Sequence, residues 1–316
     1  MNPVNRSRMA DFSLLLVAMM WGCTFLIVQS AVRVLPPLAF NSIRFTGAAL
    51  LLALITFVFY RSEWSKLSWG MVRHSLLLGL FLFMGYGFQT VGLLYTTTSN
   101  TGFITGLSVV LVPFLSLALL KHSISRYTWV SAVLAAAGLY LLTFTGTAIS
   151  LNKGDGFILL CAIAFALQIA YTGVYAPRYP ALPLATLQLA VVGMFSTIGS
   201  LFFDRPGTLI HAGQLIGKPD VLLALLISIG PTSAFAFWIQ TACQKYTTPS
   251  RVAIIYAMEP VFAALTGLAF GGETLGVTAV LGCICILAGM LMAELTPDLS
   301  RFRIRYLFRY PLFRKK

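Results

Sequence analysis

Two ionisable side chains, Glu259 and Arg44, lie inside long apolar segments of the sequence. A carboxylate there can bind a proton, a cation or a substrate amine, or helix-end donors beside Pro260 can hold it where the helix bends. A guanidinium there can pair with a substrate carboxylate, or extend along its own stem to the outer lipid headgroups. A charge at the centre of a bilayer costs at least about 2.5 kcal/mol on insertion scales, so such residues mark functional sites by default. The sequence leaves both alternatives open for each residue.

The segments that carry these charges are predicted to be transmembrane helices. The chain is 58% hydrophobic and only 10% charged, with a mean hydropathy of +0.87. A typical soluble chain is about 25% charged, so this composition excludes a soluble globular protein. A helix needs about 20 mostly apolar residues to cross a bilayer. Such segments occur at residues 12–32, 38–59, 75–95, 100–120, 127–145, 155–174, 184–203, 220–241, 251–270 and 275–294.

The distribution of Lys and Arg between alternating loops predicts the orientation. One side carries only Arg33, Lys153, Arg205 and Lys218, and the other loops and termini carry all the remaining Lys and Arg except Arg44. Cytoplasmic loops are enriched in these residues. We therefore expect a multi-pass protein of the cytoplasmic (inner) membrane with both termini in the cytoplasm.

Most of the net charge of +13 then follows from topology and does not indicate a nucleic-acid partner. Residues 297–316 form a basic tail that alternates cations with aromatic residues. This composition suits contact with anionic lipids at the cytoplasmic surface of the bilayer. A disordered, solvated tail is the alternative.

The chain contains two similar halves. Shifting it by 151 residues or, near the start of each half, by 144 residues aligns polar residues that chance apolar similarity would not match. Because five helices is an odd number, a second copy enters the membrane from the opposite side, as in many secondary transporters. We predict an all-α integral membrane protein of ten transmembrane helices, with residues 1–150 and 151–296 as two inverted five-helix repeats. The aligned pairs include Asp11 with Asp155, Pro36 with Pro180, Gln89 with Gln240, Tyr95 with Tyr246, Thr96 with Thr247, and Ser99 with Ser250.

Several short motifs carry a family resemblance. They are Trp21-Gly22 with Phe25, Arg44-Phe45, Leu94-Tyr95-Thr96, Arg251 to Phe262 with its Glu259-Pro260-Val261-Phe262 ending, and Gly272-Glu273. Together they resemble EamA-type transporters of the drug/metabolite transporter superfamily. The resemblance implies export or exchange of small metabolites, commonly amino acids and related compounds. One departure is His122, where the first half often carries the Glu of a second Gly-Glu pair.

Interrupted helices indicate where a substrate binds. Pro113, Pro260 and Gly230-Pro231 break apolar segments at positions where a cavity or neighbouring protein must satisfy the freed backbone groups. This places a cavity among the first, third, fourth, sixth, eighth and ninth helices, as the resemblance also implies. Each polar side chain there can instead form a helix–helix hydrogen bond, and the repeat-related pair Gln89 and Gln240 can serve in gating. The predicted substrate-binding residues are Trp21, Arg44, Tyr86, Gln89, Thr105, Gln168, Tyr171, Trp238, Gln240, Tyr256 and Glu259.

The fifth and tenth helices carry small residues at helical spacing, namely Ala132, Ala136, Cys285 and Gly289. This spacing is typical of close helix packing, within the chain or in a homodimer. No metal or cofactor is predicted, because the five cysteines lie in apolar segments without a partner set of ligands.

The leading hypothesis is a secondary transporter of a small metabolite, and export is the expected direction. A flippase for a lipid-linked substrate is an alternative on the same scaffold. A membrane-embedded enzyme is disfavoured, because His74, His122 and His211 fall in different predicted loops with no acidic residue nearby. The chain also lacks a phosphate-binding loop, so it is not expected to hydrolyse nucleotides.

Overall fold

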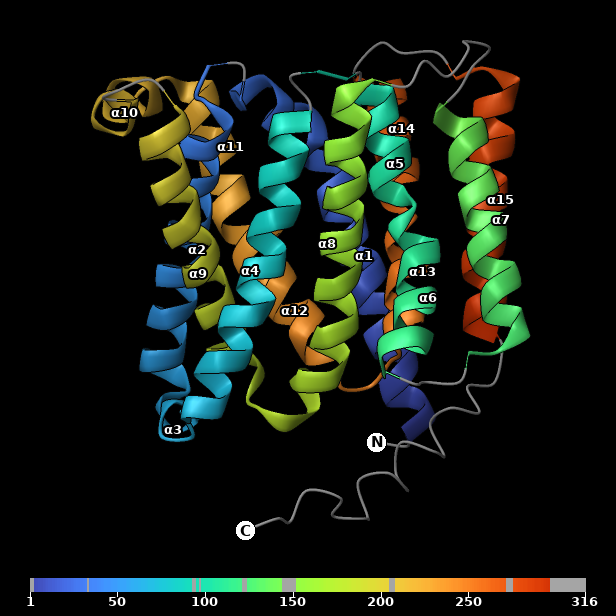
Figure 1. Ribbon diagram of the computed structural model, residues 1–316, viewed down its shortest axis with the longest axis horizontal. Helices are drawn as coiled ribbons and strands as arrows, with labels where there is room; N and C mark the ends of the chain where they lie inside the picture. The colour runs from blue at the N-terminus through green and yellow to red at the C-terminus, as the bar shows by residue number, and fades with distance from the viewer. Residues whose placement is uncertain are drawn as a thin grey trace.

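A computed structural model describes residues 3–32, 34–92, 95–96, 98–120, 124–143, 152–204, 208–270 and 275–295, and these ranges contain helices and no strands. The long helices lie side by side in one bundle (Figure 1). We call the end of the bundle at which the first helix begins the N-terminal face, and the other end the far face. The uninterrupted long helices are α1 (Pro3–Val32), α2 (Pro37–Phe59), α4 (Trp69–Gly92), α7 (Arg126–Thr143), α8 (Lys153–Tyr175), α9 (Ala181–Phe203) and α15 (Val277–Leu295).

Three further segments cross the bundle as interrupted helices. One consists of α5 (Thr98–Gly106) and α6 (Ser108–Leu120), and another of α13 (Pro249–Tyr256) and α14 (Glu259–Phe270). The third joins α11 (Pro219–Ile229) to α12 (Ala236–Cys243) through the π-helical segment η2 (Gly230–Phe235). Short helices lie at the ends of the bundle: α3 (Arg61–Trp64) and η1 (Ala176–Arg178) at the N-terminal face, and α10 (Thr208–Ile216) at the far face (Figure 1).

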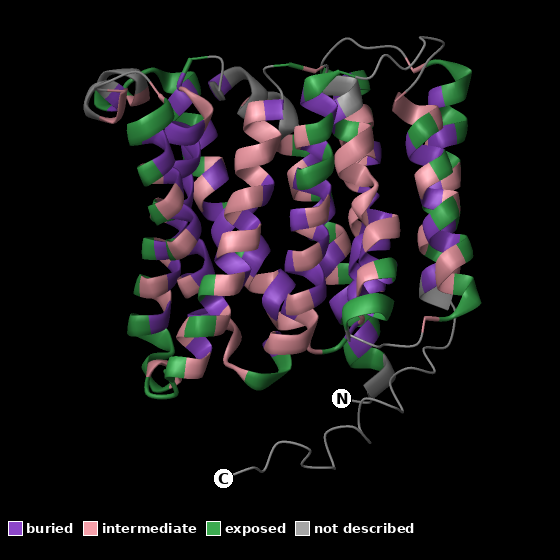
Figure 2. Ribbon diagram, viewed as in Figure 1, coloured by how far each residue is buried: buried purple, intermediate pink, exposed green. Residues whose placement is uncertain are grey.

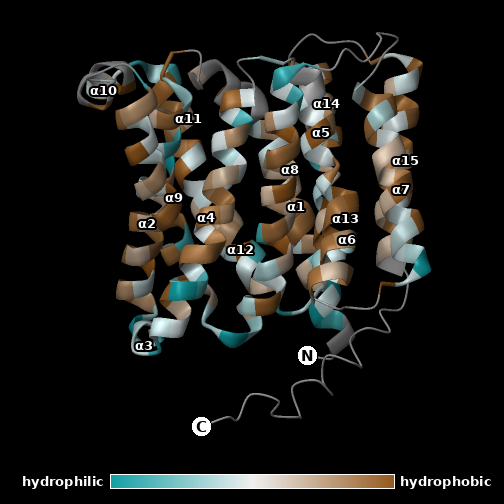
Figure 3. Ribbon diagram, in the orientation of Figure 1, coloured by the Kyte–Doolittle hydropathy of each residue, from teal (hydrophilic) through white to brown (hydrophobic). Residues whose placement is uncertain are grey.

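The bundle has the surface of a membrane protein. Within the described residues, seven helical segments are long and apolar enough to cross a bilayer. Apolar residues dominate the middle of the helices and polar ones gather at both ends (Figure 3). Large apolar side chains such as Phe203 and Phe270 are more than four-fifths exposed, whereas the inward faces are buried (Figure 2). The seven segments are Pro37–Phe59, Trp69–Gly92, Thr101–Leu119, Lys153–Arg178, Ala181–Phe203, Pro219–Cys243 and Pro249–Phe270.

The helices coincide with the predicted segments to within a few residues, with two exceptions. Helix α1 begins at Pro3 and α4 at Trp69, both well before the apolar stretch begins. Apolarity marks the part of a helix that lies in lipid, and these two helices continue past it with polar residues. The prediction that His74 and His211 lie in loops is therefore wrong, because they lie in α4 and α10. His122 falls outside the described residues.

The helix breaks also differ from the prediction at Pro113. Helix α6 continues through this residue, and the break lies at Leu107, immediately after Gly106. The equivalent break in the second half lies at Ala257 and Met258. Pro260 follows as the second residue of α14, where its missing N–H costs no helical hydrogen bond. A shift of 151 residues places Leu107 on Met258, so the two interruptions occupy equivalent positions.

Helices α7 and α15 pack on each other at small residues, as their spacing predicts. A Cβ atom on Gly282 would lie 2.5 Å from the carbonyl oxygen of Gly138 and 2.5 Å from the backbone nitrogen of Leu142. A Cβ atom on Gly289 would lie 2.8 Å from the carbonyl oxygen of Ser131. The two backbones therefore approach as closely as glycine permits.

Candidate functional site

Five of the predicted residues come together inside the bundle, and we call them the central cluster: Trp21 from α1, Arg44 from α2, Tyr86 from α4, Tyr256 from α13 and Glu259 from α14. The ring centroids of Trp21 and Tyr256 lie 4.9 Å apart in an edge-on arrangement. The guanidinium carbon of Arg44 lies 5.4 Å from the centroid of the Tyr86 ring. The charge of Arg44 also acts electrostatically on Glu259. The cluster therefore combines a cation, a carboxylate and three aromatic rings.

Arg44 is fixed by the π-helical segment η2. Its Nε atom donates a hydrogen bond to Oγ of Ser233 at 2.6 Å, and Nη2 donates to the carbonyl oxygen of Thr232 at 3.4 Å. The same carbonyl accepts a hydrogen bond from Nε1 of Trp21 at 2.8 Å. Because Arg44 is only 7% exposed, the alternative in which it extends to the outer headgroups is wrong. The break at Gly230-Pro231 thus provides an acceptor for two members of the cluster, as π-helical segments often do at functional sites.

Glu259 is the first residue of α14 and is half-buried. Its carboxylate forms no hydrogen bond with any described residue, and no ion pair within 4.0 Å joins it to Arg44. The helix-end donors proposed to hold it are therefore not found in the described part of the chain. Gly22 lets α1 approach the start of α14, because a Cβ atom at this position would lie 2.5 Å from the carbonyl oxygen of Glu259. The Trp-Gly pair thus supplies one ring of the cluster and the space that brings α14 to it.

Three phenylalanines that were not among the predicted site residues also surround the central cluster. Phe45 lies 4.9 Å and Phe165 lies 5.1 Å from Tyr86, measured between ring centroids. Phe237 lies 5.7 Å from Trp21. The repeat could have found two of them, because the shifts place Trp21 on Phe165 and Tyr86 on Phe237. The two halves therefore contribute equivalent aromatic pairs.

The phenol of Tyr256 is a second unused polar group. Its hydroxyl oxygen is buried and has no hydrogen-bond partner among the described residues. Buried polar groups without a partner destabilise a fold, so most of them are paired. A ligand held beside Tyr256 and Glu259 could engage both groups without displacing any existing hydrogen bond.

Gln168 and Gln240, also predicted, belong to a separate network of buried amides that joins α8, α9 and α12. Nε2 of Gln240 donates to Oε1 of Gln168 at 3.1 Å and to Oε1 of Gln244 at 3.4 Å. Nε2 of Gln168 donates to Oε1 of Gln188 at 3.4 Å, and Gln188 donates to Oγ1 of Thr241 at 3.2 Å. All five side chains are buried. This amide network holds three helices together, and Oε1 of Gln240 stays buried without a hydrogen-bond partner among the described residues.

The amide network gives a stability prediction. Replacing Gln168 with Leu removes the partner of both Gln240 and Gln188, and leaving buried polar groups unpaired costs about 1–3 kcal/mol. We expect a clearly lower thermal unfolding temperature in detergent. Gln89→Leu is the matched control, because Gln89 forms no hydrogen bond with a described residue. An equal decrease in unfolding temperature in the two variants would contradict the structural role of the network.

The remaining predicted residues lie outside both groups. Tyr171 stacks between Phe81 and Tyr175. The Thr105 hydroxyl lies 3.9 Å from the Cys161 sulfur, and the Trp238 ring lies 6.1 Å from that of Phe235. No cluster of three or more His, Cys, Asp and Glu side chains forms among the described residues.

Known proteins resemble this chain along nearly its whole length. The model of the EamA-like transporter family matches residues 8–144 and again residues 152–295. An uncharacterized transporter of Archaeoglobus fulgidus is 32% identical over 287 residues, covering 90% of this chain and 86% of that protein. The uncharacterized inner membrane transporter YedA of Escherichia coli K12 is 26% identical over 263 residues, covering 81% of this chain and 80% of YedA. One crystal structure shares the fold with a TM-score of 0.73 at 17% identity, over 90% of this chain and 98% of its own. This chain is a multi-pass membrane protein and belongs to the EamA-like transporter family.

Proposed function

We propose that this protein is a secondary transporter that exports a small metabolite across the cytoplasmic membrane by alternating access. The observation that carries the proposal is the central cluster, in which Arg44 and Glu259 lie among aromatic rings inside a membrane-spanning bundle. A guanidinium and a carboxylate suit a substrate that carries both an acidic and an amino group, such as an amino acid or a related compound. Charged residues inside membrane proteins typically lie on substrate or ion pathways.

The arrangement of the helices supports alternating access through two inverted repeats. The family model matches the chain twice, and the breaks at Leu107 and Met258 are equivalent under the 151-residue shift. We assign α1, α2, α4, α5–α6 and α7 to the first repeat, and α8, α9, α11–α12, α13–α14 and α15 to the second. Two such halves give one molecule two related states, each open to a different side. We further propose that the N-terminal face is cytoplasmic, because the loops predicted to lie there carry most of the Lys and Arg.

Ligand-induced stabilisation tests whether the central cluster is the binding site. A metabolite that binds the folded protein should raise its stability by about 2.7 kcal/mol at a concentration 100 times its dissociation constant. We expect a screen of amino acids and related metabolites to raise the unfolding temperature of the wild type. Tyr256→Phe and Glu259→Gln should weaken that response, and Thr266→Val, whose wild-type hydroxyl bonds to the carbonyl of Phe262 within α14, should retain it. An equal response in all four proteins would place the binding site elsewhere.

A further inference from the structure

The joint between α4 and α8 at the far face is closed. Oγ1 of Thr96, in the turn after α4, donates a hydrogen bond to Oδ1 of Asp155 at 2.5 Å. The backbone N–H of Asn152 donates to Oδ2 of the same carboxylate at 2.8 Å. A Cβ atom on Gly154 would lie 2.7 Å from the carbonyl oxygen of Gly92, so the two backbones touch. We call this contact the far joint.

The repeat places an equivalent joint at the N-terminal face, between α1 and α12. The 144-residue shift places Asp11 on Asp155, and the 151-residue shift places Thr247 on Thr96. The two turns share one backbone hydrogen bond, because the N–H of Tyr246 bonds to the carbonyl of Cys243 at 2.8 Å, as the N–H of Tyr95 bonds to that of Gly92 at 2.9 Å. We call this contact the near joint. Its Ala10 and Cys243 correspond to Gly154 and Gly92.

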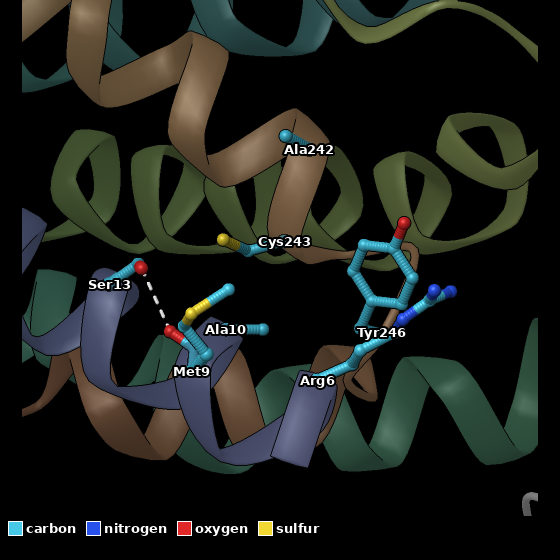
Figure 4. A pocket seen from close by; sticks show the side chains of 7 residues that line it. All are labelled: Arg6, Met9, Ala10, Ser13, Ala242, Cys243 and Tyr246. Carbon is cyan, nitrogen blue, oxygen red and sulfur yellow. Dashed lines mark hydrogen bonds between the residues drawn. The ribbon is translucent and has the colours of Figure 1, made fainter. Parts of the chain in front are cut away.

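The near joint is open where the far joint is closed. Oγ1 of Thr247 and Oδ1 of Asp11 are both buried, and neither has a hydrogen-bond partner in the part of the chain that the structure describes, although their equivalents at the far joint bond to each other. A pocket of about 200 Å³ separates α1 from α12 here, with Ala10 and Cys243 on its two sides (Figure 4). Its lining residues are Arg6, Met9, Ala10, Ser13, Ala242, Cys243 and Tyr246.

Both sides of the near joint are anchored to their surroundings. Oδ2 of Asp11 forms an ion pair with Nη1 of Arg251 at 3.3 Å. In the turn, Nζ of Lys245 donates to the carbonyl oxygen of Tyr179 at 2.9 Å. Burial lowers the pKa of Lys245, while Glu63 opposes this shift and Lys66 adds to it. The turn is thus fixed to Tyr179, between η1 and α9, and Oδ1 of Asp11 is left for a new partner.

We propose that the two joints are alternating latches, in which the Thr96–Asp155 hydrogen bond closes the far face and a Thr247–Asp11 hydrogen bond closes the N-terminal face. This inference rests on the proposed transport cycle. In the present structure the far latch is formed and the near latch is broken. In the opposite state, α1 moves towards the turn, Thr247 donates to Oδ1 of Asp11 and the pocket closes. Because Ala10 and Cys243 carry Cβ atoms where the far joint has glycines, the near joint closes at a wider backbone spacing.

The latches can be tested with a thiol that is exposed only when the far joint opens. Ile158 of α8 is fully buried and packs against Gly92. We would introduce Ile158→Cys into a chain whose five native cysteines are replaced with Ala, and measure its rate of labelling by a maleimide. This rate reports the fraction of molecules with an open far joint.

The two threonine variants should change this rate in opposite directions. Thr96→Val removes the latch of the present state and should raise the labelling rate by about threefold or more, whereas Thr247→Val weakens the opposite state and should lower it by a similar factor. Thr96→Ser keeps the hydroxyl and should label like the parent. Thr266→Val is the matched control, because the hydroxyl of Thr266 donates to the carbonyl of Phe262 in its own helix and bonds to no other described residue.

Opposite signs separate the latches from a general loss of stability, because local unfolding would raise the rate in both variants. The proposal is overturned if Thr247→Val has no effect or acts in the same direction as Thr96→Val. A failure of the proposed transport function can be distinguished from a failure of the latches, because the labelling experiment needs no substrate. If the two labelling rates shift in opposite directions but the protein exchanges no substrate, the latch proposal stands and the proposed transport function is wrong.

Discussion

Glu259→Gln is expected to abolish the response of substrate flux to a pH gradient in proteoliposomes. Glu259 lies inside the bundle, keeps part of its surface accessible and has no hydrogen-bond partner among the described residues. Gln has nearly the same shape but cannot gain or lose a proton, so a cycle that exchanges substrate for a proton at this carboxylate would stop. We expect gradient-driven flux to fall at least about tenfold, to the level of empty vesicles.

Asp220→Asn is the matched control, because Asp220 is exposed in the first turn of α11 (Pro219–Ile229), away from the central cluster. It should keep wild-type flux and wild-type gradient dependence. If Glu259→Gln responds to the gradient as the wild type does, Glu259 does not couple transport to protons. Loss of flux with and without a gradient would instead assign Glu259 to substrate binding.

Arg44→Gln is expected to reduce both stability and ligand binding. The guanidinium donates to Ser233 and to the carbonyl oxygen of Thr232, and hydrogen bonds from charged groups contribute about 1.5–3 kcal/mol. Removing the cation also leaves Glu259 without its electrostatic partner. We expect a loss of stability of at least about 1.5 kcal/mol in denaturant unfolding.

The double variant Arg44→Gln with Glu259→Gln separates charge from packing. If the two charges interact, the double variant should be more stable than the sum of the single effects implies, because it leaves no unbalanced charge. Independent sites usually add to within about 0.5 kcal/mol. Additive effects would show that Arg44 acts only through its contacts with η2.

The positions of the long helices could be predicted from sequence because a membrane imposes both a length and an apolar composition. The ends of the helices could not be predicted in the same way, because α1 and α4 continue past the lipid with polar residues. The break near Pro113 was misplaced because proline only removes a donor, whereas the neighbouring packing and Gly106 determine where the helix opens. The π-helical form of η2 could not be predicted, although Gly230-Pro231 marked its position.

The central cluster was partly predictable for the same energetic reason. Arg44 and Glu259 are costly in lipid, so their presence alone indicates a site, and Trp21 lies beside a motif glycine. The chemistry of Phe45, Phe165 and Phe237 does not distinguish a site, because an aromatic residue in an apolar segment is equally suited to facing lipid. Only the Arg44-Phe45 motif and the repeat-related positions of Phe165 and Phe237 mark them.

The two glutamines related by the repeat do not make equivalent contacts. The repeat related Gln89 to Gln240, yet only Gln240 enters the amide network, together with Gln188 and Gln244. Sequence equivalence does not guarantee equivalent contacts, because the two halves surround each residue with different neighbours. The same difference is informative at the joints, where Asp155 has a threonine partner that Asp11 lacks.

Tracer counterflow in proteoliposomes measures whether the protein carries its ligand across the membrane. Vesicles loaded with an unlabelled ligand, identified by its stabilisation of the protein, are diluted into a trace of the labelled form. With the wild type we expect a transient accumulation of label above its equilibrium level, and with Arg44→Gln we expect none. Stabilisation by the ligand without any accumulation in wild-type vesicles would contradict the proposed transport function, because the protein would then bind the ligand without carrying it across.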